Sequence, residues 1–304
     1  MSRTVSASSN KAYGVARVVV IWDLPRSSFY AARHRERNPR EPRKRGPKVL
    51  SDAELLSAIR AVLDEAVFTG EGYRKVWARL RHKGIRTAKE RVNRIMRENQ
   101  LLSPHRQPLP VTSHPHEGVI VTSQPDQMWG TDATATFTAS EGAVTIFAAI
   151  DRCTAECVGI HAVKKASRFE ALEPVRQGVR ERFRTFSPCS AAGLRLRHDH
   201  GSVYMSDDFM SVSDDFQNEI RFLGIESSPA FVRQPEGNGC IERFFRTLKE
   251  QLLWIRDFRD IEELHAALIE FRDRYNRHWI LGRLGYCTPF QTRRDFDLAL
   301  PTAA

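Results

Sequence analysis

The sequence predicts an all-α N-terminal part followed by an α/β domain whose sheet has mixed parallel and antiparallel pairing. Three observations support this fold class. Apolar residues recur at helical spacing between residues 51 and 100, segments rich in β-branched residues begin at residue 127, and helices alternate with strands from residue 168 onward. A chain of 304 residues is long enough for two or three domains.

The composition excludes several classes of protein. The chain is 41% hydrophobic and 28% charged, as ordinary globular proteins are. No stretch approaches the roughly 18 apolar residues that span a bilayer, and residues 1–11 contain no signal-peptide core. The five cysteines are scattered and form no Cys-x-x-Cys pair, which argues against a disulfide framework and a structural zinc site. We therefore expect a cytoplasmic protein with no membrane partner.

The basic residues are unevenly distributed along the chain. Residues 1–120 contain 24 lysines and arginines against 11 acidic residues, whereas the remainder contains 23 against 26. A basic end on a slightly acidic remainder is typical of a nucleic-acid-binding module attached to a second domain. The alternative is a solvated basic tail, and the helical pattern decides between the two.

Residues 1–48 are expected to form an N-terminal helical segment and a basic linker. Apolar residues at helical spacing within 11–35, interrupted at Leu24-Pro25, predict two short helices. A helix-turn-helix and a plain helical hairpin fit equally well, and the β-branched run 18–21 leaves a short strand open. The charged, proline-containing residues 36–48 are interpreted as the linker.

Residues 49–104 predict a helix-turn-helix domain of three short helices. Ser51 with Glu54, and Thr87 with Glu90, form capping-box patterns before the first and third helices, and glycines end the first two. The inward residues expected are Leu56, Ile59, Leu63 and Val67, then Val76, Trp77 and Leu80, then Val92, Ile95 and Met96. The last helix of such a domain enters the DNA major groove. The expected DNA contacts of this domain are Arg74, Lys75, Arg79, Lys89, Arg91, Arg94 and Arg97.

The remaining chain is expected to be a linker over 105–124 and then the α/β domain. The linker histidines His105, His114 and His116 have no cysteine nearby to complete a zinc site. The expected elements are strands at Met128–Thr138, Ala143–Ile150 and Cys157–Val163, a helix at 168–184, a strand at 194–198, a helix at 206–223, a short strand near Glu226 and a helix at 239–254.

Three carboxylates stand out by their positions in these elements. Asp132 lies inside the first strand, where aspartate is unusual, Asp199 ends the fourth strand, and Glu242 lies on the helix 239–254. Oxygen ligands of this kind suit hard divalent cations, and two such ions can support phosphoryl transfer. Arg246 and Lys249 follow Glu242 along one helical face, which suits a DNA phosphate path beside a metal site.

Several motifs occur in a fixed order along nearly the whole chain. They are Gly72-Tyr73-Arg74-Lys75-Val76-Trp77, Trp129-x-x-Asp132-x-Thr134, Asp199-x-Gly201-Ser202-x-Tyr204, Gly237-Asn238-x-x-x-Glu242-Arg243-Phe244-Phe245-x-Thr247-Leu248-Lys249, Tyr275-Asn276-x-His278 and Leu284-Gly285-Tyr286-x-Thr288-Pro289. Together they resemble bacterial insertion-sequence transposases of the OrfB type, whose catalytic core is related to retroviral integrases.

This resemblance implies a function and its components. It implies an RNase H-like core, placed here at 125–276 with a tail at 277–304, and a DDE triad of Asp132, Asp199 and Glu242 that binds two Mg²⁺ or Mn²⁺ ions. It implies cleavage of DNA at element ends and 3′-hydroxyl strand transfer by a homo-oligomer in a bacterial nucleoid, with a partner or fusion from an upstream reading frame left open. The rival functions are an RNase H-like nuclease or resolvase that does not join DNA, and a non-catalytic DNA-binding regulator derived from a transposase.

One spacing departs from the family pattern. Glu242 follows Asp199 by 43 positions, seven more than is usual in the family, and Ser-Asp-Asp-Phe occurs at both 206–209 and 213–216. We interpret residues 206–212 as a tandem duplication, since seven residues are almost two helical turns and change a helical face by roughly 20°.

Other residues near the triad are also candidates for roles at the site. Glu236 is a competing glutamate in a turn before the helix, and Asp151 is expected to stabilise a strand end. His198, His200 and Asn238 are candidates to orient water or phosphate, with ordinary loop histidines as the alternative for the first two.

Overall fold

The computed structural model describes residues 4–38, 50–104, 122–198, 214–229 and 239–299. The chain divides into two compact units, Met1–Ser51 and Asp52–Ala304, which are described separately. In the described residues, no helix is both long and apolar enough to cross a membrane.

The first unit contains a helical pair. α1 (Gly14–Ile21) includes residues 18–21, so the strand alternative is wrong. α2 (Arg26–Arg37) begins directly after Pro25, as the predicted interruption at Leu24-Pro25 implies, because proline cannot continue the preceding helix. Val19 is buried, whereas Ile21 and Trp22 are exposed.

The second unit begins with the predicted three-helix domain, formed by α3 (Asp52–Asp64), α4 (Tyr73–His82) and α5 (Lys89–Glu98). Its own core consists of Leu55, Ile59, Val62, Val76, Leu80, Val92, Ile95 and Met96. Two expectations are corrected. α3 ends at Asp64 and does not reach Val67, and Ala88 occupies the N-cap of α5, so Thr87 does not cap it.

A five-stranded sheet with the order β3-β2-β1-β4-β5 forms the centre of the α/β domain. The strands are β1 (Met128–Thr138), β2 (Gly142–Asp151), β3 (Cys157–Val163), β4 (Arg195–His198) and β5 (Glu226–Pro229). β1, β2 and β3 pair antiparallel, whereas β4 pairs parallel with both β1 and β5. The predicted mixed sheet is confirmed.

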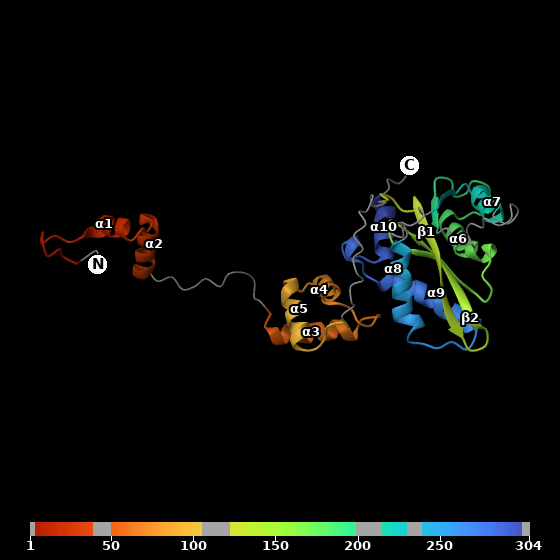
Figure 1. The fold of residues 1–304 in the computed structure, drawn as a ribbon, viewed down its shortest axis with the longest axis horizontal. Helices are drawn as coiled ribbons and strands as arrows, with labels where there is room; N and C mark the ends of the chain where they lie inside the picture. The colour runs from red at the N-terminus through yellow and green to blue at the C-terminus, as the bar shows by residue number, and fades with distance from the viewer. Residues whose placement is uncertain (1–3, 39–49, 105–121, 199–213, 230–238, 300–304) are drawn as a thin grey trace. The chain divides into compact units, whose positions relative to one another are not determined.

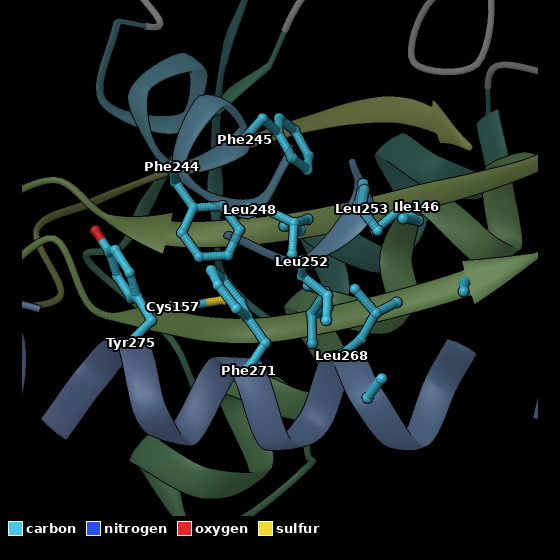
Figure 2. Packing of buried hydrophobic residues seen from close by; sticks show 14 of the residues in the cluster. Ile146, Cys157, Phe244, Phe245, Leu248, Leu252, Leu253, Leu268, Phe271 and Tyr275 are labelled. Atoms are coloured by element: carbon cyan, nitrogen blue, oxygen red, sulfur yellow. The ribbon is translucent and has the colours of Figure 1, made fainter. Parts of the chain in front are cut away.

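Helices cover both faces of the sheet (Figure 1). One hydrophobic cluster joins even-numbered β2 residues, such as Ile146 and Ala148, to α8 (Gly239–Leu248), to the π-helical segment η2 (Lys249–Leu253) and to α9 (Ile261–His278). We call this side of the sheet the α8 face. Figure 2 shows Phe244 of α8 directed toward Phe271 and Tyr275 of α9.

The other side, the α6 face, carries α6 (Arg168–Phe183) and α7 (Asp214–Phe222). α6 approaches β3 so closely that a Cβ atom on Gly159 would lie 2.0 Å from the carbonyl oxygen of Pro174. Odd-numbered residues of β1 and β2, such as Trp129 and Phe147, belong to the cluster on this face. The alternation of side chains along each strand therefore assigns every residue of β1 to one face or the other.

After α9 the chain continues into a 3₁₀ turn, η3 (Gly282–Leu284), and α10 (Pro289–Ala299), which packs against α9. These residues belong to the segment predicted as a tail. α10 is attached to the domain through the buried side chain of Arg293, whose guanidinium pairs with Asp126 and Glu156.

Candidate functional site

Asp132 lies on the α8 face of the sheet. It occupies the position of β1 between Thr131 and Ala133, and Ala133 packs against the α6-face cluster. Its antiparallel partner on β2 is Ala148, which belongs to the α8-face cluster. Because directly paired residues of neighbouring strands point to the same side, the Asp132 carboxylate is on the side of the sheet that α8 covers.

Glu242 is on α8 itself. The helix buries Ile241, Phe244 and Phe245 against the sheet, while Glu242 and Arg246 are exposed. Lys249, one turn further on, is half-buried at the start of η2. The helix therefore buries one side against the sheet and carries Glu242 at the border of that side. Of the predicted triad, Asp132 lies on β1 and Glu242 lies on the helix that packs on the side of the sheet that Asp132 faces.

Asp199 lies outside the described residues, but its covalent neighbour His198 is the last residue of β4. β4 runs parallel to β1, with Arg197 opposite Gly130, two residues before Asp132. Consecutive Cα atoms are about 3.8 Å apart, so the chain enters Asp199 from the strand directly beside β1.

His198 has structural partners on the α6 face. It is fully buried, its ring meets that of Phe216 edge to face at 5.6 Å, and its Nε2 lies 2.9 Å from Ser227 Oγ. His198 is therefore packed and hydrogen-bonded within the α6 face. His200, Asn238 and Glu236 lie outside the described residues.

Asp151 stabilises the turn after β2, as predicted. Its carboxylate is buried and accepts hydrogen bonds from the backbone and hydroxyl of Thr154 and from the backbone of Asp126. Arg293 lies 4.0 Å from the same carboxylate. Burial raises the pKa of Glu156, and the charges of Arg182 and Arg293 oppose that rise. No local sequence pattern predicts this cluster of Arg293 with three acidic residues, because Arg293 lies more than a hundred positions from its partners.

Four of the predicted DNA-contact side chains are on α5, and three of them are arginines. Arg91 and Arg94 both donate to Asp52 at the start of α3, and Arg94 also pairs with Glu98. Arg97 is exposed. These exposed ion pairs add little stability, since such pairs are worth at most about 1 kcal/mol, so phosphate groups can compete for the arginines.

Lys89 and Arg74, also predicted to contact DNA, contact aromatic rings. The Lys89 ammonium lies 4.4 Å from the centre of the Trp77 ring, and Arg74 donates to the hydroxyl of Tyr73. Both partners, Trp77 and Tyr73, belong to the three-helix domain itself.

Lys75 and Arg79 both contact the end of α9. The Lys75 ammonium lies 2.9 Å from the centre of the Trp279 ring. Arg79 donates to the carbonyl of His278 and forms a bidentate pair with buried Glu71 of its own domain. Both side chains are therefore engaged by other residues of the chain.

The segment between α3 and α4 also packs on the α/β domain. Phe68 is 3% exposed and meets the rings of Phe271 and Trp279 edge to face. Gln251, in the π-helical segment, exchanges hydrogen bonds with the backbone of Thr69. This explains why apolar residues continue beyond the end of α3.

The donor set on the α8 face suits a hard divalent cation. The described residues contain no group of three His, Cys, Asp or Glu side chains that could hold a metal, and Asp199 is outside them. Asp132 and Glu242 supply carboxylate oxygens, the ligands that Mg²⁺ and Mn²⁺ prefer. Proteins with an integrase core domain typically use a divalent metal.

Comparisons with known proteins agree with this arrangement. Residues 51–108 match the family model of the HTH-like domain, and residues 223–289 match that of the integrase core domain. Transposase InsD for insertion element IS2A/D/F/H/I/K of Escherichia coli is 27% identical over 249 residues, which cover 80% of this chain and 79% of that protein. Transposase InsD for insertion element IS2 on the F plasmid of E. coli strain K12 gives the same values.

Two solved structures are also similar. The catalytic core domain of BIV integrase has a TM-score of 0.41 and 19% identity, covering 57% of this chain and 97% of its own. A simian T-cell lymphotropic virus intasome, solved in complex with PP2A regulatory subunit B56 gamma, has a TM-score of 0.44 and 16% identity, covering 84% and 76%.

The family matches, together with the mixed sheet and its two helical layers, define the class of protein. The chain contains an HTH-like domain followed by an integrase core domain built on a mixed five-stranded sheet, and it is similar over four fifths of its length to insertion-element transposases. Within that class it is similar to the InsD transposases of IS2 elements.

Proposed function

We propose that this chain cleaves DNA at the ends of its element and joins the freed 3′-hydroxyl to target DNA, with Asp132, Asp199 and Glu242 as the metal-binding carboxylates. The observation that supports this most strongly is the placement of Asp132 and α8 on the same face of the sheet. Asp199 directly follows β4, the strand that pairs with β1, and the last pair between these strands, Arg197 with Gly130, is two residues before both Asp199 and Asp132.

Each carboxylate has a role that follows from its setting. Asp132 is fixed by the strand pairing of β1 with β2, and its Oδ1 accepts a hydrogen bond of 2.8 Å from the backbone of Ala133. Glu242 is carried by a helix that its buried neighbours hold against the sheet. The two divalent ions would neutralise phosphate charge and increase the acidity of water or of a 3′-hydroxyl.

The proposed domains divide DNA binding from catalysis. The domain 49–104 holds the terminal repeats, chiefly through Arg91, Arg94 and Arg97 of α5, while the linker 105–124 leads to the catalytic core. Arg246 and Lys249 extend the DNA path along α8. We place the core at 125–276 together with α10, because Arg293 pairs with Asp126 at the start of the core. Joining two element ends requires a multimer on DNA.

Conservative substitutions of the triad test the proposal. Asp132→Asn, Asp199→Asn and Glu242→Gln keep the side-chain shape but remove a charged metal ligand. Each should abolish Mg²⁺-dependent cleavage and joining of a duplex that carries the inverted repeat flanking the gene, while binding of the same duplex stays within about threefold of wild type, since binding rests on phosphate contacts elsewhere.

Glu236→Gln is the matched control, because it neutralises the competing glutamate six positions earlier. Near-normal strand transfer by Glu242→Gln, with loss in Glu236→Gln, would overturn the assignment of the third carboxylate. Cleavage without joining by the wild type would instead favour the nuclease alternative.

A further inference from the structure

Arg197 places a buried positive charge beside the candidate catalytic face. It is the third residue of β4 and is 4% exposed. Its neighbours Leu196 and His198 face the α6 side, where they contact the cluster on that face. By the alternation of the strand, Arg197 faces the α8 side, as Asp132 does, and it pairs with Gly130, two residues before Asp132. Neighbouring strands lie about 4.8 Å apart and rise about 3.3 Å per residue, so the Cα atoms of Arg197 and Asp132 are about 8 Å apart, within reach of one phosphate group.

Two further arginines converge on this place from other segments. Arg152 follows β2 directly, and its backbone amide donates to the carbonyl of Met128 at 3.0 Å. Arg283, in η3, donates to the carbonyl of Cys153 at 3.1 Å and approaches Cys240 Sγ at 3.6 Å. Cys240 is the second residue of α8 and precedes Glu242 by two positions. Arg283 therefore connects the turn after β2 to the first turn of the helix that carries Glu242.

The Arg152 guanidinium is close enough to the other two to feel their charges: burial lowers the pKa of Arg152, and the nearby positive charges of Arg197 and Arg283 lower it further. The first turn of α8 adds backbone amides and the positive end of the helix dipole. A phosphate oxygen at this position would be attracted by the guanidinium groups and by the end of the helix.

We propose that Arg152, Arg197 and Arg283 form a binding site for a backbone phosphate of the DNA strand next to the bond that is cut. The proposal rests on the proposed function, because it assigns these arginines to the substrate of the same site. A phosphodiester fits the chemistry, since guanidinium groups donate in pairs to phosphate oxygens and bind more strongly than neutral donors. The role is one of positioning: the arginines fix the strand, and the carboxylates remain responsible for the chemistry.

The test removes the charge on each side of the contact. Arg283→Gln is the principal variant, because Arg283 is exposed and the protein should fold without it. Arg283→Lys keeps the charge, and Arg259→Gln, at a residue 81% exposed in its side chain, is the matched control. The DNA probe is the element-end duplex, either unmodified or with one neutral methylphosphonate placed in turn at each phosphate flanking the cleavage site.

The expected results are specific to a phosphate contact. Arg283→Gln should lower kcat/KM for cleavage about 10-fold to 100-fold, the usual effect of losing a hydrogen bond to a charged group, and Arg283→Lys should recover part of it. Without metal, the slope of log affinity against log salt should fall by about 0.9 for the lost contact. One methylphosphonate position should weaken wild-type binding by the same factor as Arg283→Gln and should have no additional effect on that variant.

Two outcomes separate this site from the catalytic assignment. If Arg283→Gln matches Arg259→Gln in cleavage, salt slope and methylphosphonate sensitivity, the phosphate site is wrong, although the triad stands. If the wild type fails to cleave in Mg²⁺ while the binding results appear as expected, the arginines bind phosphate and the catalytic proposal is wrong. Arg152→Lys and Arg197→Lys, which keep the buried charges, should reduce cleavage less than the corresponding glutamine variants that still fold.

Discussion

Replacing Phe68 by alanine should weaken the attachment of the three-helix domain to the integrase core. Phe68 is buried at 3% exposure, and burial of a phenylalanine side chain contributes about 1.5–3 kcal/mol. Its edge-to-face contacts with Phe271 and Trp279, at 6.1 Å and 5.0 Å between ring centres, add about 0.5–1.5 kcal/mol each. Together these contributions come to about 2.5–6 kcal/mol, which agrees with the loss of about 3–5 kcal/mol that is usual for phenylalanine-to-alanine changes in a core.

The assay is urea unfolding of the full chain followed by tryptophan fluorescence, to which Trp279 beside the substituted residue contributes together with the other four tryptophans. Phe68→Ala should shift the transition that this probe follows to a lower urea concentration. Phe137→Ala is the control, because Phe137 is 73% exposed and its loss should change stability by no more than about 0.5 kcal/mol. Coincident transitions for the two variants would refute the docking of Phe68 on the core.

Three further predictions address other parts of the chain. Gly159→Ala should destabilise the core by several kcal/mol in thermal unfolding, because the new Cβ would meet the carbonyl of Pro174 at 2.0 Å, and an unchanged Tm would contradict the close packing of α6 on β3. Burial raises the pKa of Cys157 to about 12, so iodoacetamide at pH 8 should modify exposed Cys189 well before Cys157, as peptide mass spectrometry would show, and equal labelling would argue against that burial. The same shift contributes stability that is present below pH 9.0 and is lost as the pH rises toward 12. A variant that lacks residues 206–212 should retain Mg²⁺-dependent cleavage, measured at matched soluble concentration, because seven residues are almost two helical turns. A variant that lacks four residues there should cleave less, because the following helix would rotate by roughly 40°. If the seven-residue deletion folds but does not cleave, the repeat has a function of its own.

The strands could be predicted from the sequence because their pattern is local. β1 and β3 have the predicted bounds, and β2 differs by one residue at each end. Threonine, valine and isoleucine fit a pleated, half-buried surface, and Gly142, with a φ of 74°, marks the turn between β1 and β2. The sequence therefore predicts that Asp132 lies inside β1, whereas the side of the sheet to which Asp132 points follows only from the pairing of β1 with β2.

The errors arise where contacts between distant segments decide the structure. Val67 continues the apolar spacing of α3, but it lies past the end of the helix and packs on the integrase core. Lys75 and Arg79 look like solvent-facing cations in the sequence, yet Trp279 and buried Glu71 hold them. No local pattern distinguishes a lysine over an aromatic ring from a lysine in water, because the ring lies about two hundred residues away in the chain.

The acidic residues of the core divide into two groups by their partners. Asp126, Asp151 and Glu156 lie where the strand ends meet α10, and Arg293 is within ion-pair distance of all three. Burial lowers the pKa of Arg293, but the hydrogen bonds that it donates to Asp126 and the three negative charges outweigh burial, so the pKa is raised and the guanidinium stays charged. A buried acid with a buried cation beside it is stabilised in place and is a poor ligand for a metal ion.

Asp132 and Glu242 belong to the second group. Glu242 is exposed and Asp132 is partly exposed, and both are held by elements whose position the hydrophobic α8-face cluster fixes. Carboxylates that a rigid scaffold orients and that solvent can reach are suited to binding a cation from solution. Arg293 contributes to the proposed chemistry indirectly, because it neutralises the three acids at the strand ends and so holds α10 against the core that carries Asp132.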